Sequence, residues 1–334
     1  MAKIAGFELE QWEQGYLRER LGRHRFFLTR DHSLLKHLKQ ARDAEILTIF
    51  INTPITKEAL DRLPKLRFIA TMSTGFDHID LAECRRRKIV VSNVPFYGEN
   101  TVAEHTFALI LALSRRILPA VENTRKGYFD LKGTRGFDLK GKTLGIVGGG
   151  HIGMHVARMA AGFEMKVLVY DIRKDRKLAR KMGFRYSSLN SLLRRSDVIS
   201  LHLPYNTHTH HIINKKNISL IRKGALLINT ARGGLIETDA LIKALASKRI
   251  MGAGLDVLEG EAEIKEERQL LSAVFQKSID YKTQLEIQLL LNQESVLVTP
   301  HSAFNSKEAL HRILDTTVAN IRGFLQNRVR NRVR

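Results

Sequence analysis

The segment 143–163, TLGIVGGGHIGMHVARMAAGF, constrains the fold of this chain more than any other stretch. The apolar run TLGIV is typical of a buried strand, and Gly148, Gly150 and Gly153 follow it in the spacing G-x-G-x-x-G at the start of a helical pattern. The first glycine permits a tight turn, the second lets the backbone approach a pyrophosphate, and the third lets helix and strand pack closely. Free N–H groups at the helix start then hold the phosphates. The sequence therefore predicts a dinucleotide-binding strand–turn–helix unit.

A carboxylate stands where such a unit recognises its cofactor. Asp171 follows the next predicted strand, 167–170. At that strand end a carboxylate accepts hydrogen bonds from the adenosine ribose hydroxyls, and it would repel a 2′-phosphate. Arg173 and Lys174 come directly after it, and their positive charges would weaken the selection of NAD over NADP. We therefore expect NAD as the cofactor, with the strictness of selection against NADP left open.

Short β-rich runs alternate with longer helical runs along the whole chain, which predicts parallel sheets wound by helices. A chain of 334 residues exceeds the length at which one hydrophobic core stops growing, so we expect two domains. The strands expected in the first third are 45–51, 67–71 and 89–92, separated by helices near 57–63 and 79–87. The strands expected later are 143–147, 167–170, 198–203, 226–229, 252–256 and 296–299.

Two long helices are also expected. Thr101 and Glu104 have the spacing of a capping box ahead of the apolar run FALILAL, so one long helix should begin near Thr101. A second helical pattern covers roughly 307–325. Repeats and flexible linkers are not evident in the sequence.

Lysine and arginine outnumber aspartate and glutamate by 55 to 34, which gives a formal net charge of +21. The basic clusters, at 85–88, 173–181, 194–195 and 328–334, are scattered along the chain. No zinc-finger spacing, aromatic RNA platform or basic leucine zipper accompanies them. We therefore expect solvated basic faces and no specific nucleic-acid binding, and the purpose of the charge stays open.

Composition also bears on compartment and metal content. Cys84 is the only cysteine, which excludes an internal disulfide and any multi-cysteine metal site, and we predict no metal. The apolar stretch 102–113 includes Glu104 and His105 and is shorter than the roughly 20 residues that a bilayer requires. The N-terminus has no secretory pattern. A cytoplasmic protein without a membrane span is expected.

Three polar residues follow predicted strands, where open α/β sheets bind ligands. Arg232 stands in NTARGG, and a guanidinium grips a carboxylate with two parallel hydrogen bonds. Glu261 lies five positions after Asp256 in LDVLEGE, and His301 follows a strand and a proline in TPHSAF. Alone, a histidine is more often structural or exposed than catalytic, and a glutamate in an acidic loop is usually solvated.

Seven ordered motifs together resemble the family of D-isomer-specific 2-hydroxyacid dehydrogenases, over nearly the whole chain. They are STGFDHIDL (73–81), NVPFYGENTVAEHTFALILAL (93–113), GKTLGIVGGGHIG (141–153), VISLHLP (198–204), INTARGGLI (228–236), GLDVLEGE (254–261) and TPHSAF (299–304). The resemblance implies two doubly wound domains. Residues 1–100 with 300–334 would form a flavodoxin-like substrate-binding domain, and residues 101–299 an inserted Rossmann domain for NAD. It also implies a homodimer formed through the NAD domain.

The resemblance implies a role for each polar residue. His301 would be the general acid in reduction, with Glu261 hydrogen-bonded to its imidazole. Arg232 would bind the substrate carboxylate and polarise the carbonyl. The backbone N–H groups of Thr74 and Gly75 would be the second grip on the carboxylate.

The resemblance also assigns cofactor contacts, beside the three glycines and Asp171. They are His151, Ile152, Thr101, Val102, Pro204, Thr230, Ala231 and Asp256. Asp256 would accept a hydrogen bond from the nicotinamide carboxamide, and a structural role for Asp256 stays open.

Aromatic residues indicate the branch within the family. Phe50, Tyr97 and Phe304 fall where the lactate-type branch has aromatic groups, and PHSAF is more similar to that branch's PHTAF than to the glycerate branch's PHIGS. A crowded pocket favours pyruvate, with D-lactate as product. The charged, helical-looking stretch 262–292 departs from the lactate branch, and its contacts stay open.

Several alternatives remain. The first is a D-2-hydroxyisocaproate or phenyllactate type of dehydrogenase, and the second is a glyoxylate/hydroxypyruvate (phosphoglycerate) type. A non-enzymatic alternative is an NAD-sensing, corepressor-like binding protein, supported only by the positive charge. Formate dehydrogenase is disfavoured, because its relatives have glutamine where Glu261 stands.

Overall fold

The computed structural model describes residues 1–259 and 281–333. These residues form two compact units, Met1–Tyr97 with Ser306–Arg334 and Gly98–Asn305. The family resemblance implies domain limits at 100/101 and 299/300. The larger compact unit instead begins at Gly98 and extends to Asn305. In the part of the chain that the structure describes, no helix is both long and apolar enough to cross a membrane.

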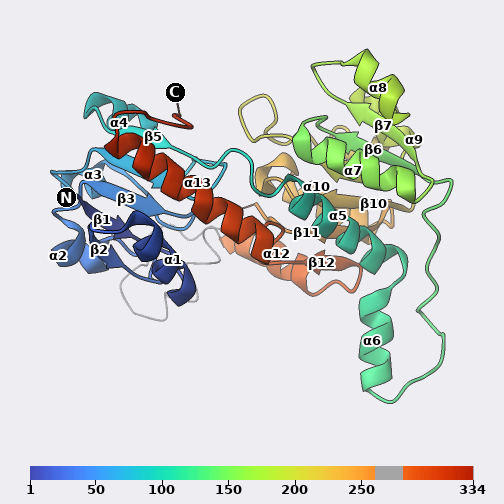
Figure 1. Ribbon diagram of the computed structural model, residues 1–334. Coiled ribbons are helices and arrows are strands. Elements are labelled where there is room, and N and C mark those ends of the chain that lie inside the picture. Colours follow the sequence, from blue (N-terminus) through green and yellow to red (C-terminus); the bar gives the residue numbers. More distant parts are fainter. Residues whose placement is uncertain (260–280, 334) are drawn as a thin grey trace. The chain divides into compact units, whose positions relative to one another are not determined.

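The smaller unit is a five-stranded parallel sheet in the order β2-β1-β3-β4-β5 (Figure 1). Its strands are β1 (Lys3–Gly6), β2 (Arg25–Leu28), β3 (Ile46–Ile49), β4 (Phe68–Thr71) and β5 (Val90–Ser92). Its helices are α1 (Gln11–Leu21), η1 (Leu35–His37), α2 (Leu38–Ala41), α3 (Lys57–Asp61), α4 (Leu81–Arg86) and α13 (Lys307–Leu325). The strands predicted at 45–51, 67–71 and 89–92 are confirmed as β3, β4 and β5, whereas β1 and β2 have no counterpart in the prediction.

The C-terminal helix α13 completes the smaller unit. The ring of Phe324 stacks on that of Phe68 in β4, with centroids 4.4 Å apart. The ring of Trp12 in α1 stacks on His311, and the Tyr16 hydroxyl donates to Asp315. Residues from both ends of the chain therefore share one core.

The larger unit is a seven-stranded parallel sheet in the order β12-β11-β10-β9-β6-β7-β8. Its strands are β6 (Thr143–Val147), β7 (Lys166–Tyr170), β8 (Arg185–Tyr186), β9 (Val198–Leu201), β10 (Ala225–Asn229), β11 (Ile250–Leu255) and β12 (Val296–Val298). Its helices are α5 (Glu99–Ser114), α6 (Ile117–Arg125), α7 (His151–Gly162), α8 (Arg176–Met182), α9 (Leu189–Arg195), α10 (Thr238–Ala246) and α12 (Tyr281–Leu291), with short turns η2 (Ile218–Leu220) and η3 (Gly233–Leu235). The six strands predicted here are confirmed, and the two-residue β8 is an addition at the sheet edge.

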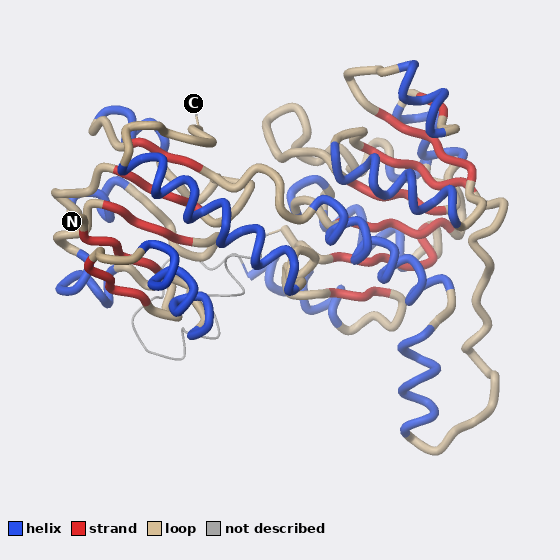
Figure 2. The backbone as a smooth tube through the Cα atoms, in the orientation of Figure 1, coloured by secondary structure: helices blue, strands red, loops and turns tan. Residues whose placement is uncertain are grey.

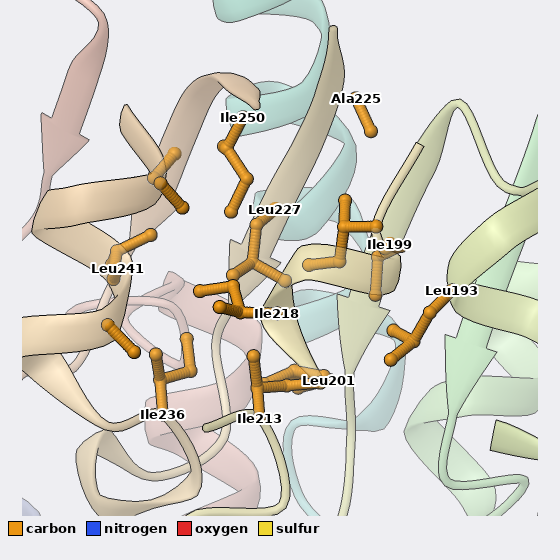
Figure 3. Close-up of a cluster of buried hydrophobic side chains, with 14 of the residues drawn as sticks. Leu193, Ile199, Leu201, Ile213, Ile218, Ala225, Leu227, Ile236, Leu241 and Ile250 are labelled. Carbon is orange, nitrogen blue, oxygen red and sulfur yellow. The ribbon is translucent and has the colours of Figure 1, made fainter. Parts of the chain in front are cut away.

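Helices cover both faces of this sheet (Figure 2). Along β10, Leu226 and Ile228 belong to the core that includes α5 and α7, whereas Leu227 belongs to the opposite core, with α9 and α10 (Figure 3). Because neighbouring side chains point to opposite faces and both faces are buried, the strand is a continuous apolar run rather than an alternating one. The fold class, two doubly wound α/β sheets, is confirmed.

One local prediction is wrong. The long helix α5 begins at Glu99 after Gly98, with no side-chain cap, rather than at a capping box of Thr101 and Glu104. Thr101 lies inside the first turn and is buried, and Glu104 accepts a hydrogen bond from Asn100 instead. The same two residue types at the same spacing therefore belong to the helix itself.

Truncation of Leu227 tests the central packing of the larger unit. Leu227 is fully buried, so Leu227→Ala should lower the free energy of unfolding by about 2–5 kcal/mol through lost burial and a residual cavity. Leu285→Ala, at a side chain that is 62% exposed on α12, is the matched control and should change it by less than about 0.5 kcal/mol. Urea unfolding followed by circular dichroism measures both, because the only tryptophan, Trp12, reports on the smaller unit. Equal midpoints for the two variants would contradict the packing described.

Candidate active site

The order of the larger sheet contains a point where the direction of winding changes. The chain runs from β6 outward to β7 and β8, and then returns to β9 on the other side of β6. In open α/β sheets, ligands bind at the carboxyl ends of the two strands that flank such a point. Gly148 follows β6 and His202 follows β9, and a Cβ on Gly148 would lie 2.6 Å from the His202 carbonyl oxygen. The glycine loop therefore occupies the expected ligand crevice of this unit.

Each glycine of the loop has a distinct physical reason. Gly148 has a φ of 108°, which L-residues rarely adopt. A Cβ on Gly153 would lie 2.1 Å from the Gly148 carbonyl oxygen, so only glycine lets α7 pack against the turn. A Cβ on Gly150 would meet nothing within 4 Å, and Gly150 is the residue before the first turn of α7. That open space in front of helical N–H groups fits a pyrophosphate.

Asp171 lies at the end of β7 beside this loop. One of its carboxylate oxygens, Oδ2, accepts from the Gly149 N–H at 2.7 Å, and Oδ1 accepts from the Arg173 N–H at 2.7 Å. A carboxylate oxygen can accept more than one hydrogen bond, so both oxygens keep acceptor capacity for ribose hydroxyls. The side chains of Arg173 and Lys174 are exposed next to it.

His202, in the same crevice, was not among the residues predicted from the sequence. It is partly buried, and burial lowers the pKa of its imidazole to about 3. Its Nε2 lies 2.8 Å from the Ser200 hydroxyl, and its Nδ1 has no hydrogen-bond partner among the described residues. At neutral pH the His202 ring is uncharged, so it is a poor source of a proton for chemistry.

The loop after β10 carries Arg232. The buried Asn229 side chain spans this loop, because its Oδ1 accepts from the Ala231 N–H at 3.1 Å and its Nδ2 donates to the Arg232 carbonyl at 2.8 Å. The Arg232 guanidinium donates through Nη1 to the Ala231 carbonyl at 2.7 Å. Asn229, which sequence reasoning missed, therefore shapes the loop, and its signal was a polar residue at the end of an otherwise apolar strand.

Glycine brings the Arg232 loop against the loop after β11. A Cβ on Gly233 would lie 2.1 Å from the carbonyl carbon of Leu258. The neighbouring Glu259 carboxylate lies 2.5 Å from His211 Nε2 and accepts from the Thr238 hydroxyl at 2.8 Å. Backbone contact and partly buried polar contacts thus hold the two loops together.

The loop that carries His301 is held by Asp256, whose side chain is 1% exposed. The Asp256 carboxylate accepts from the Thr299 hydroxyl at 2.6 Å, the Ser302 N–H at 2.8 Å and the Ala303 N–H at 2.9 Å. The backbone carbonyl of Asp256 accepts from the His301 N–H at 2.9 Å. Donors on both sides of His301 therefore converge on one residue.

These hydrogen bonds offset the cost of an unfavourable backbone conformation at His301. His301 has a φ of 54°, the left-handed region, which costs an L-residue about 1–2 kcal/mol. Hydrogen bonds to a charged acceptor contribute about 1.5–3 kcal/mol each, so the Asp256 carboxylate is sufficient to hold this conformation. Strained residues that are held in this way are common at functional sites.

Helix α5 contributes the residues predicted around the nicotinamide. Thr101 is buried in its first turn and Val102 is partly buried. One turn later, the Thr106 hydroxyl lies 2.9 Å from that of Thr230, in the loop that leads to Arg232. Thr106 was not predicted, although it ties α5 to that loop.

The smaller unit holds Thr74 and Gly75 in a polar turn after β4. The Ser73 hydroxyl donates to the Gly75 carbonyl at 2.6 Å, and the Thr74 hydroxyl donates to the Val94 carbonyl at 2.8 Å. Across residues 1–259 and 281–333, the backbone N–H groups of Thr74 and Gly75 donate to no other group. These two adjacent donors are chemically suited to a carboxylate.

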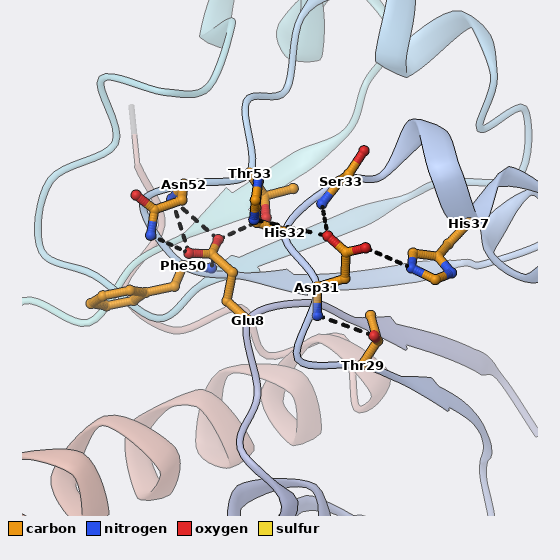
Figure 4. Close-up of polar contacts among 9 residues, drawn as sticks. All are labelled: Glu8, Thr29, Asp31, His32, Ser33, His37, Phe50, Asn52 and Thr53. Carbon is orange, nitrogen blue, oxygen red and sulfur yellow. Dashed lines mark hydrogen bonds and ion pairs between the residues drawn. The ribbon is translucent and has the colours of Figure 1, made fainter. Parts of the chain in front are cut away.

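The smaller sheet also changes its winding direction, between β1 and β3. Glu8 follows β1, and its carboxylate accepts from the Phe50 N–H at 3.2 Å, the Asn52 side chain at 2.8 Å and the Thr53 hydroxyl at 2.7 Å (Figure 4). Glu8 has a φ of 60° and was not predicted from the sequence. It fixes the backbone from which Phe50 projects.

The remaining predicted residues are placed as follows. His151 and Ile152 begin α7, and the Pro204 carbonyl accepts from the Thr209 hydroxyl at 2.7 Å. The Tyr97 carbonyl accepts from Arg312 Nε at 2.7 Å, and Phe304 is partly buried, next to Gly98. Glu261 and most of the stretch 262–292 lie outside the described residues.

A strand–glycine loop–helix unit, a ribose-type carboxylate and a clamped histidine loop define an NAD-dependent oxidoreductase of the doubly wound class. Comparison with known proteins specifies it further. Residues 107–303 match the family model described as "D-isomer specific 2-hydroxyacid dehydrogenase, NAD binding domain". The chain belongs to the D-isomer-specific 2-hydroxyacid dehydrogenase family, as the sequence motifs predicted.

Individual relatives cover nearly the whole chain. A 2-hydroxyacid dehydrogenase homolog of Zymomonas mobilis is 36% identical over 85% of this chain and 84% of its own. A glyoxylate reductase of Thermococcus litoralis is 34% identical over 87% of this chain and 84% of its own. The crystal structure of D-lactate dehydrogenase from Aquifex aeolicus, complexed with NAD and lactic acid, has a TM-score of 0.86 and 36% identity over 97% of this chain and 96% of its own.

The two glycines of the loop should respond differently to a methyl group. Gly153→Ala should destabilise the protein, because its Cβ would overlap the Gly148 carbonyl. Gly150→Ala should leave the thermal midpoint within about 2 °C but weaken NADH binding at least about tenfold, because its Cβ would fill the space for the pyrophosphate. Thermal unfolding and a fluorescence titration with NADH measure the two effects. Parent-like NADH affinity in a folded Gly150→Ala variant would contradict the assignment.

Proposed function

We propose that this protein reduces a small 2-keto acid to the D-2-hydroxy acid with NADH, and that pyruvate is its best substrate, giving D-lactate. The observation that carries the proposal is the His301 loop, in which a buried carboxylate holds the histidine in a strained conformation at the carboxyl edge of an NAD-binding sheet. The Aquifex aeolicus relative, whose structure contains NAD and lactic acid, supports the same substrate class.

The proposed reaction adds one hydride and one proton to the keto group. Bound NADH supplies the hydride to the carbonyl carbon. His301 donates the proton to the carbonyl oxygen and then regains one from solvent, so that keto acid, NADH and a proton become hydroxy acid and NAD⁺. Glu261 would hydrogen-bond the imidazole. In the oxidation direction, His301 acts as the base.

Arg232 is proposed to bind the substrate carboxylate and to stabilise the charge that develops on the keto oxygen. Its hydrogen bond to the Ala231 carbonyl limits the orientations of the guanidinium, which reduces the entropy lost on binding. The N–H groups of Thr74 and Gly75 form the proposed second grip on the carboxylate. Phe50, Tyr97 and Phe304 are proposed to limit the size of the substrate side chain.

A second substrate class is favoured by a specific observation, the similarity to the glyoxylate reductase of Thermococcus litoralis. Initial rates of NADH oxidation with pyruvate, glyoxylate, hydroxypyruvate, 2-ketoisocaproate and phenylpyruvate separate the candidates. The proposal expects the highest kcat/KM for pyruvate, because the proposed aromatic lining would favour a methyl group over a polar or bulky substituent. A tenfold preference for glyoxylate or phenylpyruvate would overturn the choice of substrate, and tight NADH binding without any turnover would favour an NAD-sensing binding protein.

Replacement of His301 tests the proton donor. His301→Ala should lower kcat for pyruvate reduction by about 10²–10⁴-fold, the usual contribution of a general acid, while NADH affinity stays within about twofold. His202→Asn is the matched control, because partial burial keeps the His202 ring neutral and His202 is proposed to take no part in proton transfer. Turnover by His301→Ala within a few-fold of the parent would exclude the proposed role.

We also propose that the protein is a homodimer, formed through an apolar arm of the larger unit. Helix α6 and the loop after it extend away from the sheet of this unit (Figure 1). Large apolar side chains are exposed along this arm: Ile117, Leu118, Val121, Tyr128, Phe129 and Leu131. Several large apolar side chains exposed on one projecting segment are typical of a protein interface.

A charge in the arm should prevent association. Phe129 and Leu131 are 81% and 85% exposed, so the double variant Phe129→Glu/Leu131→Glu should fold normally but sediment as a monomer, because it would bury two unpaired carboxylates. Leu35→Glu, at an exposed leucine of the smaller unit, is the control. Sedimentation velocity measures the mass. A parent protein that is monomeric at micromolar concentration would contradict the proposal.

A further inference from the structure

Helix α5 has a polar contact with the His301 loop that none of the predicted roles uses. The side chain of His105, in the second turn of α5, is 23% exposed, and its Nε2 lies 3.0 Å from the Thr299 hydroxyl. The same nitrogen is 3.6 Å from Asp256 Oδ1. His105, Thr299 and Asp256 therefore form a short polar chain that ends on the carboxylate holding His301 in place.

The direction of the hydrogen bonds along this chain can be derived. The Asp256 carboxylate accepts, so the Thr299 hydroxyl uses its single proton to donate to Asp256 Oδ1 at 2.6 Å. The Thr299 oxygen is then left as an acceptor toward His105. His105 must therefore donate its Nε2–H to Thr299.

The hydrogen bond from His105 affects the orientation of groups in the loop that carries His301. With the Nε2–H of His105 on its oxygen, the Thr299 hydroxyl is held with its own proton toward Asp256. Without that donor, the hydroxyl can rotate to other acceptors, and the carboxylate loses one of the groups that fix its orientation. The Ser302 and Ala303 N–H groups, on the other side of His301, bind the same carboxylate and would shift with it.

The helix that carries His105 is itself tied to a second loop. The next residue of α5, Thr106, donates to the Val102 carbonyl at 2.8 Å and meets the Thr230 hydroxyl at 2.9 Å. Adjacent residues of one helix thus reach two loops, the loop after β12 with His301 and the loop after β10 with Arg232. Sites on regular elements hold catalytic geometry more accurately than sites on loops alone.

We propose that His105 is a positioning residue: through Thr299 and Asp256 it holds the His301 backbone in the left-handed conformation from which the imidazole delivers its proton. This inference rests on the proposed function of His301. It assigns no contact with substrate or cofactor to His105.

The test compares His105→Leu, which removes the donor, with His105→Gln, whose amide nitrogen can reach a similar position and donate. Loss of one hydrogen bond in the chain should lower kcat for pyruvate reduction about tenfold in His105→Leu, while NADH affinity changes less than about twofold. The primary isotope effect on kcat with 4-deuterated NADH should rise, because the chemical step becomes slower than product release. His105→Gln should return kcat to within about threefold of the parent.

If His105 had only a structural role, the pattern of kcat values and isotope effects would differ. Equal losses in the two variants, with an unchanged isotope effect, or parent-like kcat in His105→Leu, would overturn the proposal. If His105→Leu does not fold, Thr299→Val removes the relaying hydroxyl without altering α5 and should give the same fall in kcat and the same rise in the isotope effect.

A double-variant cycle separates this inference from the function on which it rests. In a His301→Ala background, His105→Leu should have no further effect on the residual rate, because the group that it positions is gone. A further tenfold loss in that background would show that His105 acts elsewhere. Full activity of His301→Ala by itself would reject the proposed proton donor, a result that does not depend on His105.

Discussion

The structure of the candidate site depends on one buried carboxylate. Asp256 is almost fully enclosed, and a buried carboxylate is stable only when hydrogen-bond donors surround it. The Thr299 hydroxyl and two backbone N–H groups supply them, and in doing so they fix both sides of His301. The hydrogen bonds that stabilise the buried Asp256 carboxylate therefore also hold His301 in the left-handed backbone conformation, which an L-residue otherwise avoids. Asp256 serves the loop, beside any role toward the nicotinamide carboxamide that the family resemblance implies.

Close backbone approach has a comparable effect on the cofactor side. Gly148 lies against the carbonyl after β9, Gly153 against the turn that Gly148 makes, and Gly233 against the backbone after β11. None of these places has room for a side chain, so the loops at the carboxyl edge are held at van der Waals distance. The two layers of helices bury both faces of the sheet and make this edge rigid. We propose that recognition of NAD then requires few additional groups: the open space at Gly150 and the Asp171 carboxylate.

Much of this architecture could be predicted from the sequence, because apolar runs of strand length and a glycine triplet are local signals. Six of the seven strands of the larger sheet and the family were predicted correctly. β1 and β2 were missed because their β signals are weak: KIAG contains one β-branched residue, and RFFL lies between basic residues in RHRFFLTR. The capping box at Thr101 failed because spacing alone does not show where a helix begins. His105 and Glu8 were missed for another reason: their partners, such as Thr299 for His105, are distant in the sequence, and only the fold brings them together. Asn229 has partners only two and three residues away, and its signal was local: a polar residue at the end of an apolar strand.

The most direct test of the central claim is the chirality of the product. Purified protein, pyruvate and NADH should give lactate in amounts equal to the NADH oxidised, and chiral chromatography should show the D-enantiomer alone. That result would establish hydride transfer to a 2-keto acid with the stereochemistry that the family name states. L-lactate, a racemic product, or NADH binding without any lactate would contradict the account.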